Sequence, residues 1–148
     1  MVSGKSVKLM KKLLSACLFL LWTGLATAQS AIGVWKTIDD ENGQAKSHVQ
    51  IYEQGGKLYG KVVQILTERP DRLCDKCPGE RHNQPVMGMI IMENMAFNDG
   101  YWQGGRILDP EKGKWYTCKI WLKEGNPNVL VVRGFVGPFS RTHDWDRM

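Results

Sequence analysis

The chain has 148 residues, of which 43% are hydrophobic and 24% charged, and its formal net charge is +5. The length fits one ordinary globular domain, and the apolar fraction excludes a disordered chain. Four N-terminal lysines account for most of that charge. The other residues carry 16 basic and 15 acidic side chains, and this balance argues against electrostatic binding to nucleic acid.

The N-terminal segment has the pattern of a secretory signal peptide. Lys11 and Lys12 precede an apolar run over residues 13–25, and an Ala-Thr-Ala tripeptide ends at position 28. A cationic start, a short apolar core and a small-x-small site predict a signal peptide over residues 1–28, cleaved after Ala28. The mature protein is therefore expected to be periplasmic or secreted.

Two other interpretations of this segment stay open. A membrane anchor would need roughly 20 apolar residues, which is more than residues 13–25 supply. A lipid attached at Cys17 would fit the Leu-Ser-Ala-Cys sequence that ends there. However, only four residues separate this cysteine from the cationic pair, and the apolar run continues past it.

The mature chain, residues 29–148, contains no internal repeat or linker and is expected to form one domain. Short β-branched and aromatic segments alternate with turns rich in Gly, Asn, Asp and Pro, and no segment shows a sustained helical period. A long polar loop is expected over residues 67–85, and residues 86–95 fit either a strand or a short helix. The pattern predicts strands over residues 32–38, 47–53, 57–66, 101–108, 115–122, 128–136 and 140–147.

This strand pattern predicts an all-β fold. About eight antiparallel strands joined by hairpins must protect their edges, and a closed up-and-down barrel does so directly. A sandwich is the alternative, but it would need longer crossover connections than the sequence provides. Barrels of about eight strands can hold one small ligand inside, so the fold suggests binding.

Four motifs resemble the domain-of-unknown-function 2147 family. They begin at Gly33 (Gly-Val-Trp-Lys-Thr), Cys74 (Cys-Asp-Lys-Cys-Pro-Gly-Glu), Gly105 (Gly-Arg-Ile-Leu-Asp-Pro-Glu-Lys-Gly-Lys) and Arg141 (Arg-Thr-His-Asp-Trp-Asp-Arg). The resemblance covers residues 32–147 and implies an exported bacterial protein. The family has no established activity.

The start of the first strand also resembles that of lipocalins. There a Gly-x-Trp motif, here Gly33 and Trp35, supplies a tryptophan that closes one barrel end, and an arginine from the last strand packs on it. Arg141 or Arg147 would take that part. The resemblance therefore implies a lipocalin-like barrel.

The three cysteines of the mature chain allow several chemistries. We expect a disulfide that ties the long loop, either Cys74–Cys77 or one of these with Cys118. A zinc site with His82 as fourth ligand is an alternative. Redox catalysis is less favoured, because the Pro-Gly pair after Cys77 opposes the helix that such a motif requires.

A cluster of methionines offers a second metal hypothesis. Thioethers bind Cu(I), and they are also ordinary core residues. Their apolar neighbours favour packing. The cluster consists of Met87, Met89, Met92 and Met95.

Arginines inside a barrel would suit an anionic amphiphile, because they form charge-assisted hydrogen bonds with a carboxylate or phosphate. If Trp145 faces inward, Arg141 shares its face. On the preceding strand Arg133 shares a face with valines and a phenylalanine, which we expect to be interior. The predicted ligand-binding residues are therefore Trp35, Arg133, Arg141 and Trp145. The alternative is that these arginines pair with acidic side chains at the surface.

On the strand over residues 115–122, Tyr116, Cys118, Ile120 and Leu122 are expected in the core. Trp115 and Trp121 would then point outward, where they would suit contact with a membrane surface or a protein partner.

The leading hypothesis is non-enzymatic binding of a small hydrophobic or amphiphilic molecule, with no cofactor. No Gly-x-Ser-x-Gly, His-Glu-x-x-His or phosphate-loop motif is present. Two alternatives remain. One is metal handling through the cysteines with His82 or through the methionines, and the other is a ligand-free envelope interaction module.

Overall fold

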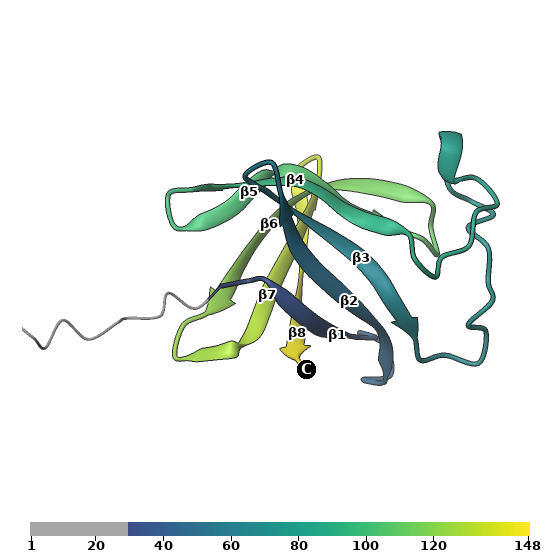
Figure 1. The fold of residues 1–148 in the computed structure, drawn as a ribbon, viewed down its shortest axis with the longest axis horizontal. Coiled ribbons are helices and arrows are strands. Elements are labelled where there is room, and N and C mark those ends of the chain that lie inside the picture. The colour runs from purple at the N-terminus through teal and green to yellow at the C-terminus, as the bar shows by residue number, and fades with distance from the viewer. Residues whose placement is uncertain (1–29) are drawn as a thin grey trace, which may run out of the picture.

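Eight strands follow one another around a closed sheet (Figure 1). The structure, a computed structural model, describes residues 30–148, so the predicted signal peptide over residues 1–28 lies outside the described residues. In chain order the strands are β1 (Gly33–Ile38), β2 (Ala45–Gln54), β3 (Lys57–Ile65), β4 (Ile90–Asn98), β5 (Tyr101–Asp109), β6 (Lys114–Lys123), β7 (Asn126–Val136) and β8 (Phe139–Arg147).

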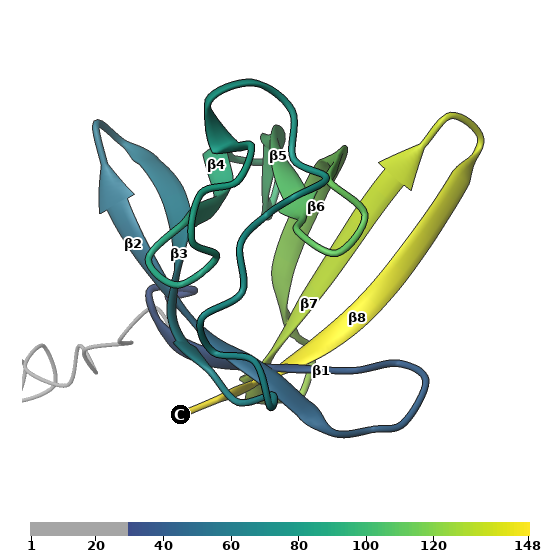
Figure 2. The same ribbon diagram turned by 90° about the vertical axis from the view of Figure 1, so that its right-hand side faces the viewer.

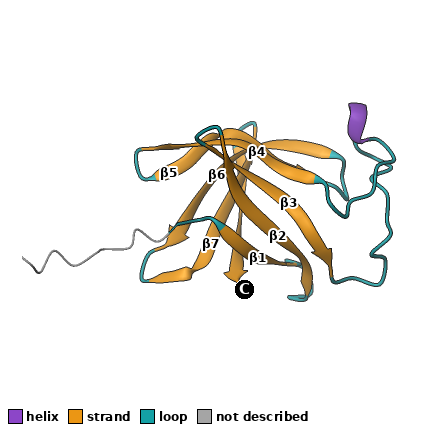
Figure 3. Ribbon diagram, in the orientation of Figure 1, coloured by secondary structure: helices purple, strands orange, loops and turns teal. Residues whose placement is uncertain are grey.

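Each strand pairs antiparallel with the next, and β8 returns to pair with β1. In this closing pair Trp35 lies opposite Arg147 and Lys36 lies opposite Asp146. Figure 3 shows that strands form the barrel, whereas the short helix η1 (Gly79–Arg81) lies in a loop. The predicted all-β, up-and-down barrel is therefore confirmed.

Hairpin chemistry explains the tightest connections. The turn between β2 and β3 consists of Gly55 and Gly56, with φ of 60° and 76°. Glycine adopts such left-handed angles at both central positions of a hairpin turn without steric penalty. The ambiguous segment over residues 86–95 is mainly strand, because β4 begins at Ile90 and the four residues before it end the long loop.

The barrel interior is apolar. Inward-facing residues alternate along the strands, and six of the largest fully buried side chains come from five strands: Trp35, Ile51, Met92, Met95, Ile120 and Leu130. The predicted core face of β6 is confirmed at Cys118 and Ile120, which are 3% and 0% exposed, and Leu122 packs against the core. Tyr116, also expected in the core, is only half-buried.

Alternate turns lie at opposite ends of the barrel. At one end, here called the N-terminal end, are the start of β1 and the β2–β3, β4–β5 and β6–β7 turns. At the other, the loop end, are the β1–β2, β5–β6 and β7–β8 turns and the long loop over residues 66–89. Within residues 30–148, no helix has the length and apolar character needed to cross a membrane.

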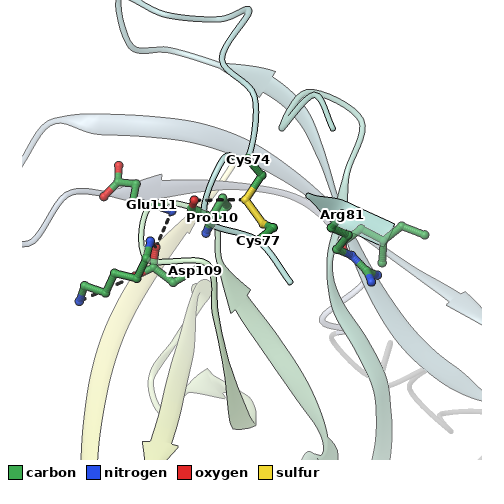
Figure 4. Close-up of a disulfide and its surroundings, with 8 residues drawn as sticks. Cys74, Cys77, Arg81, Asp109, Pro110 and Glu111 are labelled. Carbon is green, nitrogen blue, oxygen red and sulfur yellow. Dashed lines mark hydrogen bonds and ion pairs between the residues drawn. A yellow bond between two sulfur atoms is a disulfide. The ribbon is translucent and has the colours of Figure 1, made fainter. Parts of the chain in front are cut away.

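The long loop docks on the β5–β6 turn. Cys74 and Cys77 form a disulfide, as expected, and both are buried. The Sγ atom of Cys74 lies 3.3 Å from the carbonyl oxygen of Pro110 (Figure 4). Gly113 lies so close to the loop that a Cβ there would overlap the backbone of Lys76. Figure 2 shows the loop running across the barrel end that faces the viewer.

Candidate functional site

Trp35 and Arg147 close the N-terminal end. The Trp35 indole is 0% exposed, and its Nε1 donates a hydrogen bond of 2.8 Å to the carbonyl of Ala31. The Arg147 guanidinium lies 4.1 Å from the centroid of that ring. It also donates hydrogen bonds to the carbonyls of Ser30, Ile32 and Pro127. Arg141 and Arg147 are the two candidates for the arginine that packs on this tryptophan, and Arg147 is the one that does so.

Arg141 and Arg133 lie on opposite faces of the sheet. Trp145 pairs with Leu130, and Arg141 pairs with Gly134, so Arg141 shares the inward face but is exposed beside the β7–β8 turn. Arg133 pairs with Thr142, on the outer face. The expectation that Arg133 points inward is therefore wrong.

The cause of that error is the composition of β7. Residues 129–132 are all apolar, so the sequence lacks the alternation that distinguishes the two faces. The structure places Leu130 and Val132 in the core cluster, whereas Val131 lies outside it, opposite Trp121 in the register. Trp35 and Trp145 are core residues, and their role in ligand binding, like that of Arg141, stays a prediction.

The two outward tryptophans of β6 have different surroundings. Two guanidinium groups lie near the Trp115 ring, that of Arg106 at 4.0 Å and that of Arg81 of the loop at 4.9 Å from its centroid. Both arginines also pair with Glu93. The loop thus covers this part of the outer face, which explains why the outward-facing Leu108 is only 2% exposed. Trp121 instead borders a groove.

The structure does not bring together the cysteines and His82 that the metal-binding alternative requires. The thiols of Cys74 and Cys77 are consumed in the disulfide, and within residues 30–148 no three His, Cys, Asp or Glu side chains are grouped to hold a metal ion. Burial raises the pKa of the Cys118 thiol to about 12, so it stays neutral and unreactive. Met92 and Met95 are core residues, whereas Met87 is exposed.

An aromatic groove of about 650 Å³ lies at the N-terminal end. Its apolar lining consists of Phe97, Tyr101, Trp102, Trp121 and Leu122, and its polar side chains are Ser30 and Asp99. In Figure 1 the β4–β5 and β6–β7 hairpins, which supply most of these residues, project on the side where the described chain begins.

Two aromatic pairs shape the groove. The Phe97 and Trp102 rings are tilted, with centroids 5.0 Å apart, and Tyr101 meets Trp121 edge-on at 5.5 Å. Trp102 and Leu122 pack on the core, whereas Phe97 is 62% exposed. Part of the groove lining is therefore fixed by packing on the core, and part of it is an aromatic ring exposed to water. Sequence reasoning singled out only Trp121, because the groove joins two hairpins that no local motif connects.

Two cations flank the groove on the outer face. The Lys119 Nζ lies 3.6 Å from the Tyr101 ring centroid, and the Arg133 guanidinium lies 5.3 Å from that of Trp121. The Nε of Arg133 donates to the hydroxyl of Thr142 at 2.8 Å. Positive charge is thus held against two aromatic residues that line the groove.

At the loop end, Glu111 joins the long loop to the barrel. Its carboxylate is 2.9 Å from Lys46 of β2 and 3.3 Å from Arg72 of the loop. The hydrogen bond from Lys46 and the positive charge of Arg72 hold the pKa of Glu111 below its ordinary value of 4.5, although partial desolvation opposes this.

We expect Glu111→Gln to destabilise the protein at neutral pH but not in acid. A lowered folded-state pKa stabilises the fold above the ordinary value, and this contribution is lost as the pH falls through the folded-state pKa. Because the pair is partly exposed, the effect should be about 1 kcal/mol or less. Chemical denaturation from pH 7 to pH 3 measures it, with the exposed Glu124→Gln as control. An unchanged difference at pH 3 would contradict the assignment.

Comparison with known proteins agrees with this architecture. The family model described as "Uncharacterized protein conserved in bacteria (DUF2147)" matches residues 33–147. Among solved structures, protein HP1028 from Helicobacter pylori, described as belonging to the lipocalin family, is similar with a TM-score of 0.69 and 17% identity. The similarity covers 80% of this chain and 83% of that chain. Comparison with curated proteins gave no match.

Proposed function

Because this chain belongs to the DUF2147 family of bacterial proteins and folds as a lipocalin-like barrel, we propose that it binds one small hydrophobic or amphiphilic molecule without converting it chemically. The observation that carries the proposal is the aromatic groove. Its volume of about 650 Å³ suits a single small ligand, since such pockets are mostly apolar with a few polar groups.

The groove supports this function better than the barrel interior around Trp35. Trp35 and Trp145 are already packed among core side chains, and the Arg147 guanidinium is used to hold the chain start. A ligand in the groove would instead cover Phe97, whose ring is exposed to water. Removing aromatic surface from water supplies the driving force for binding.

Export is part of the proposal. The signal-like segment over residues 1–28 and the Cys74–Cys77 disulfide both fit an oxidising compartment. The mass of the protein recovered from its own cells tests this part. A mature chain that begins at Gln29 supports export by cleavage, whereas an intact N-terminus contradicts it.

The binding test uses the neutral fluorescent probe N-phenyl-1-naphthylamine. We expect its emission to rise on addition of the mature protein, and we expect Phe97→Asp to weaken binding about tenfold or more, because the charge would be desolvated beside the bound probe. Phe97 is largely exposed, so this substitution should leave the fold intact.

Phe139→Asp is the matched control. Phe139 is 75% exposed, but it lies in β8 at the loop end, away from the groove. Equal affinity of the Phe139→Asp variant and the unsubstituted protein is expected. If the probe does not bind, or if Phe139→Asp rather than Phe97→Asp weakens binding, the groove is not the site and the proposal fails.

A further inference from the structure

Two like charges lie opposite each other beside two aromatic rings of the groove lining. In the register of β6 and β7, Lys119 lies opposite Arg133 on the outer face. Like charges opposite each other on neighbouring strands repel and destabilise the sheet. An anionic group placed between or beside the two charges would relieve this repulsion.

Acidic side chains of the described chain do not neutralise this pair. The acid nearest to it in the register, Asp144, forms an ion pair of 2.6 Å with Lys123 instead. Within residues 30–148, neither Lys119 nor Arg133 forms a salt bridge. The two terminal nitrogens of Arg133 also remain for a ligand, because only its Nε is used by Thr142.

The cations are continuous with the apolar groove. Lys119 lies over Tyr101 and Arg133 lies over Trp121, and both aromatic rings line the groove. A molecule in the groove that contacts these two rings therefore has two positive charges nearby. The acidic lining residue Asp99 belongs to the β4–β5 turn, so it would repel an anion placed at that turn and favour the opposite orientation.

We propose that the ligand is a single-chain anionic amphiphile, with its apolar chain in the groove and its carboxylate, sulfate or phosphate headgroup held by Lys119 and Arg133. This inference rests on the proposed function and specifies its ligand class. The guanidinium offers two parallel N–H donors to an anionic headgroup, and the ammonium adds a third charge-assisted hydrogen bond. A hollow of single-ligand size favours one bound molecule over a lipid bilayer, which would need a broader apolar face.

The test compares three twelve-carbon probes below their micellar concentrations: dodecanoate, dodecanol and dodecyltrimethylammonium. Each displaces N-phenyl-1-naphthylamine from the protein. We expect dodecanoate to act at an about tenfold lower concentration than either of the others, and we expect added salt to reduce this preference.

Substitution of the cations separates the headgroup from the groove. The double variant Lys119→Gln, Arg133→Gln should lose the preference for dodecanoate and keep its affinity for the neutral probe. The variant loses two cation–ring contacts and the hydrogen bond to Thr142, but it also loses the repulsion, so its melting temperature should stay close to that of the unsubstituted protein and misfolding would not explain the loss. Lys114→Gln, which removes a lysine lying over Tyr116 away from the groove, is the control and should retain the preference.

The outcomes distinguish this inference from the proposed function. If the neutral probe binds but the double variant keeps the dodecanoate preference, the headgroup assignment fails and the groove stands. If Arg141→Gln removes the preference instead, the headgroup lies on the inward face and the inference is overturned. A third outcome would also overturn the inference. If the protein sediments with anionic phospholipid vesicles and dodecanoate does not compete, the binding partner is a membrane surface and not a single amphiphile. Failure of the neutral probe removes both proposals.

Discussion

Trp35→Ala is expected to lower the free energy of unfolding by about 3–5 kcal/mol, the usual cost of truncating a buried large aromatic side chain. The indole is fully buried, and its removal leaves a cavity at the N-terminal end. The loss also removes the stacking partner of Arg147 and the hydrogen bond to Ala31. Chemical denaturation followed by circular dichroism measures the change.

Trp121→Ala provides the matched control, because Trp121 lies on the outer face at the groove. Its loss should cost about 1 kcal/mol, the scale of its contact with Tyr101. Arg147→Lys should lie between the two, since an ammonium keeps the charge but cannot reach three carbonyls as the guanidinium does. Equal costs for Trp35→Ala and Trp121→Ala would contradict the assignment of Trp35 as the residue that closes the barrel.

The fold could be predicted because its information is local. The Gly55-Gly56 turn and the Asp-Pro turn at Asp109 each join two alternating segments, so hairpins follow from neighbouring residues alone. Once most consecutive strands form hairpins, closing the sheet into a barrel is the simplest way to pair the exposed backbone groups of the first and last strands. The same local reasoning assigned the core face of β6, where Cys118 and Ile120 alternate with polar or aromatic residues.

The parts that sequence reasoning missed depend on distant segments. The orientation of Arg133 required the register of β7, because four successive apolar residues fit either face. The covering of Trp115 depends on Arg81, which reaches it from the long loop. The groove joins Phe97 of β4 to Leu122 of β6, so no periodicity within one strand could indicate it.

Gly105→Ala should destabilise the barrel by about 3 kcal/mol, at the upper end of the cost of overpacking. A Cβ at this position would overlap the carbonyl oxygen of Glu93 and the Sδ of Met95. Asn94, between them, has a φ of 61°, so β4 is irregular at the point where it approaches β5. A thioether can move, but a strand backbone cannot shift without breaking its ladder. Thermal and chemical denaturation test the prediction.

Gly134→Ala makes the comparison sharp, because Gly105 and Gly134 both lie opposite Cys118, one on each neighbouring strand. A Cβ at Gly134 would meet Tyr116 at an ordinary contact distance of 3.5 Å, so this change should be nearly neutral. The two glycines thus occupy one row of the barrel but have different neighbours, the β4 backbone at Gly105 and the Tyr116 side chain at Gly134. A similar loss in both variants would mean that the row is intolerant of any side chain. A loss confined to Gly105→Ala would mean that the close approach of β4 sets the requirement, and with it the position of the β4–β5 hairpin that carries the groove.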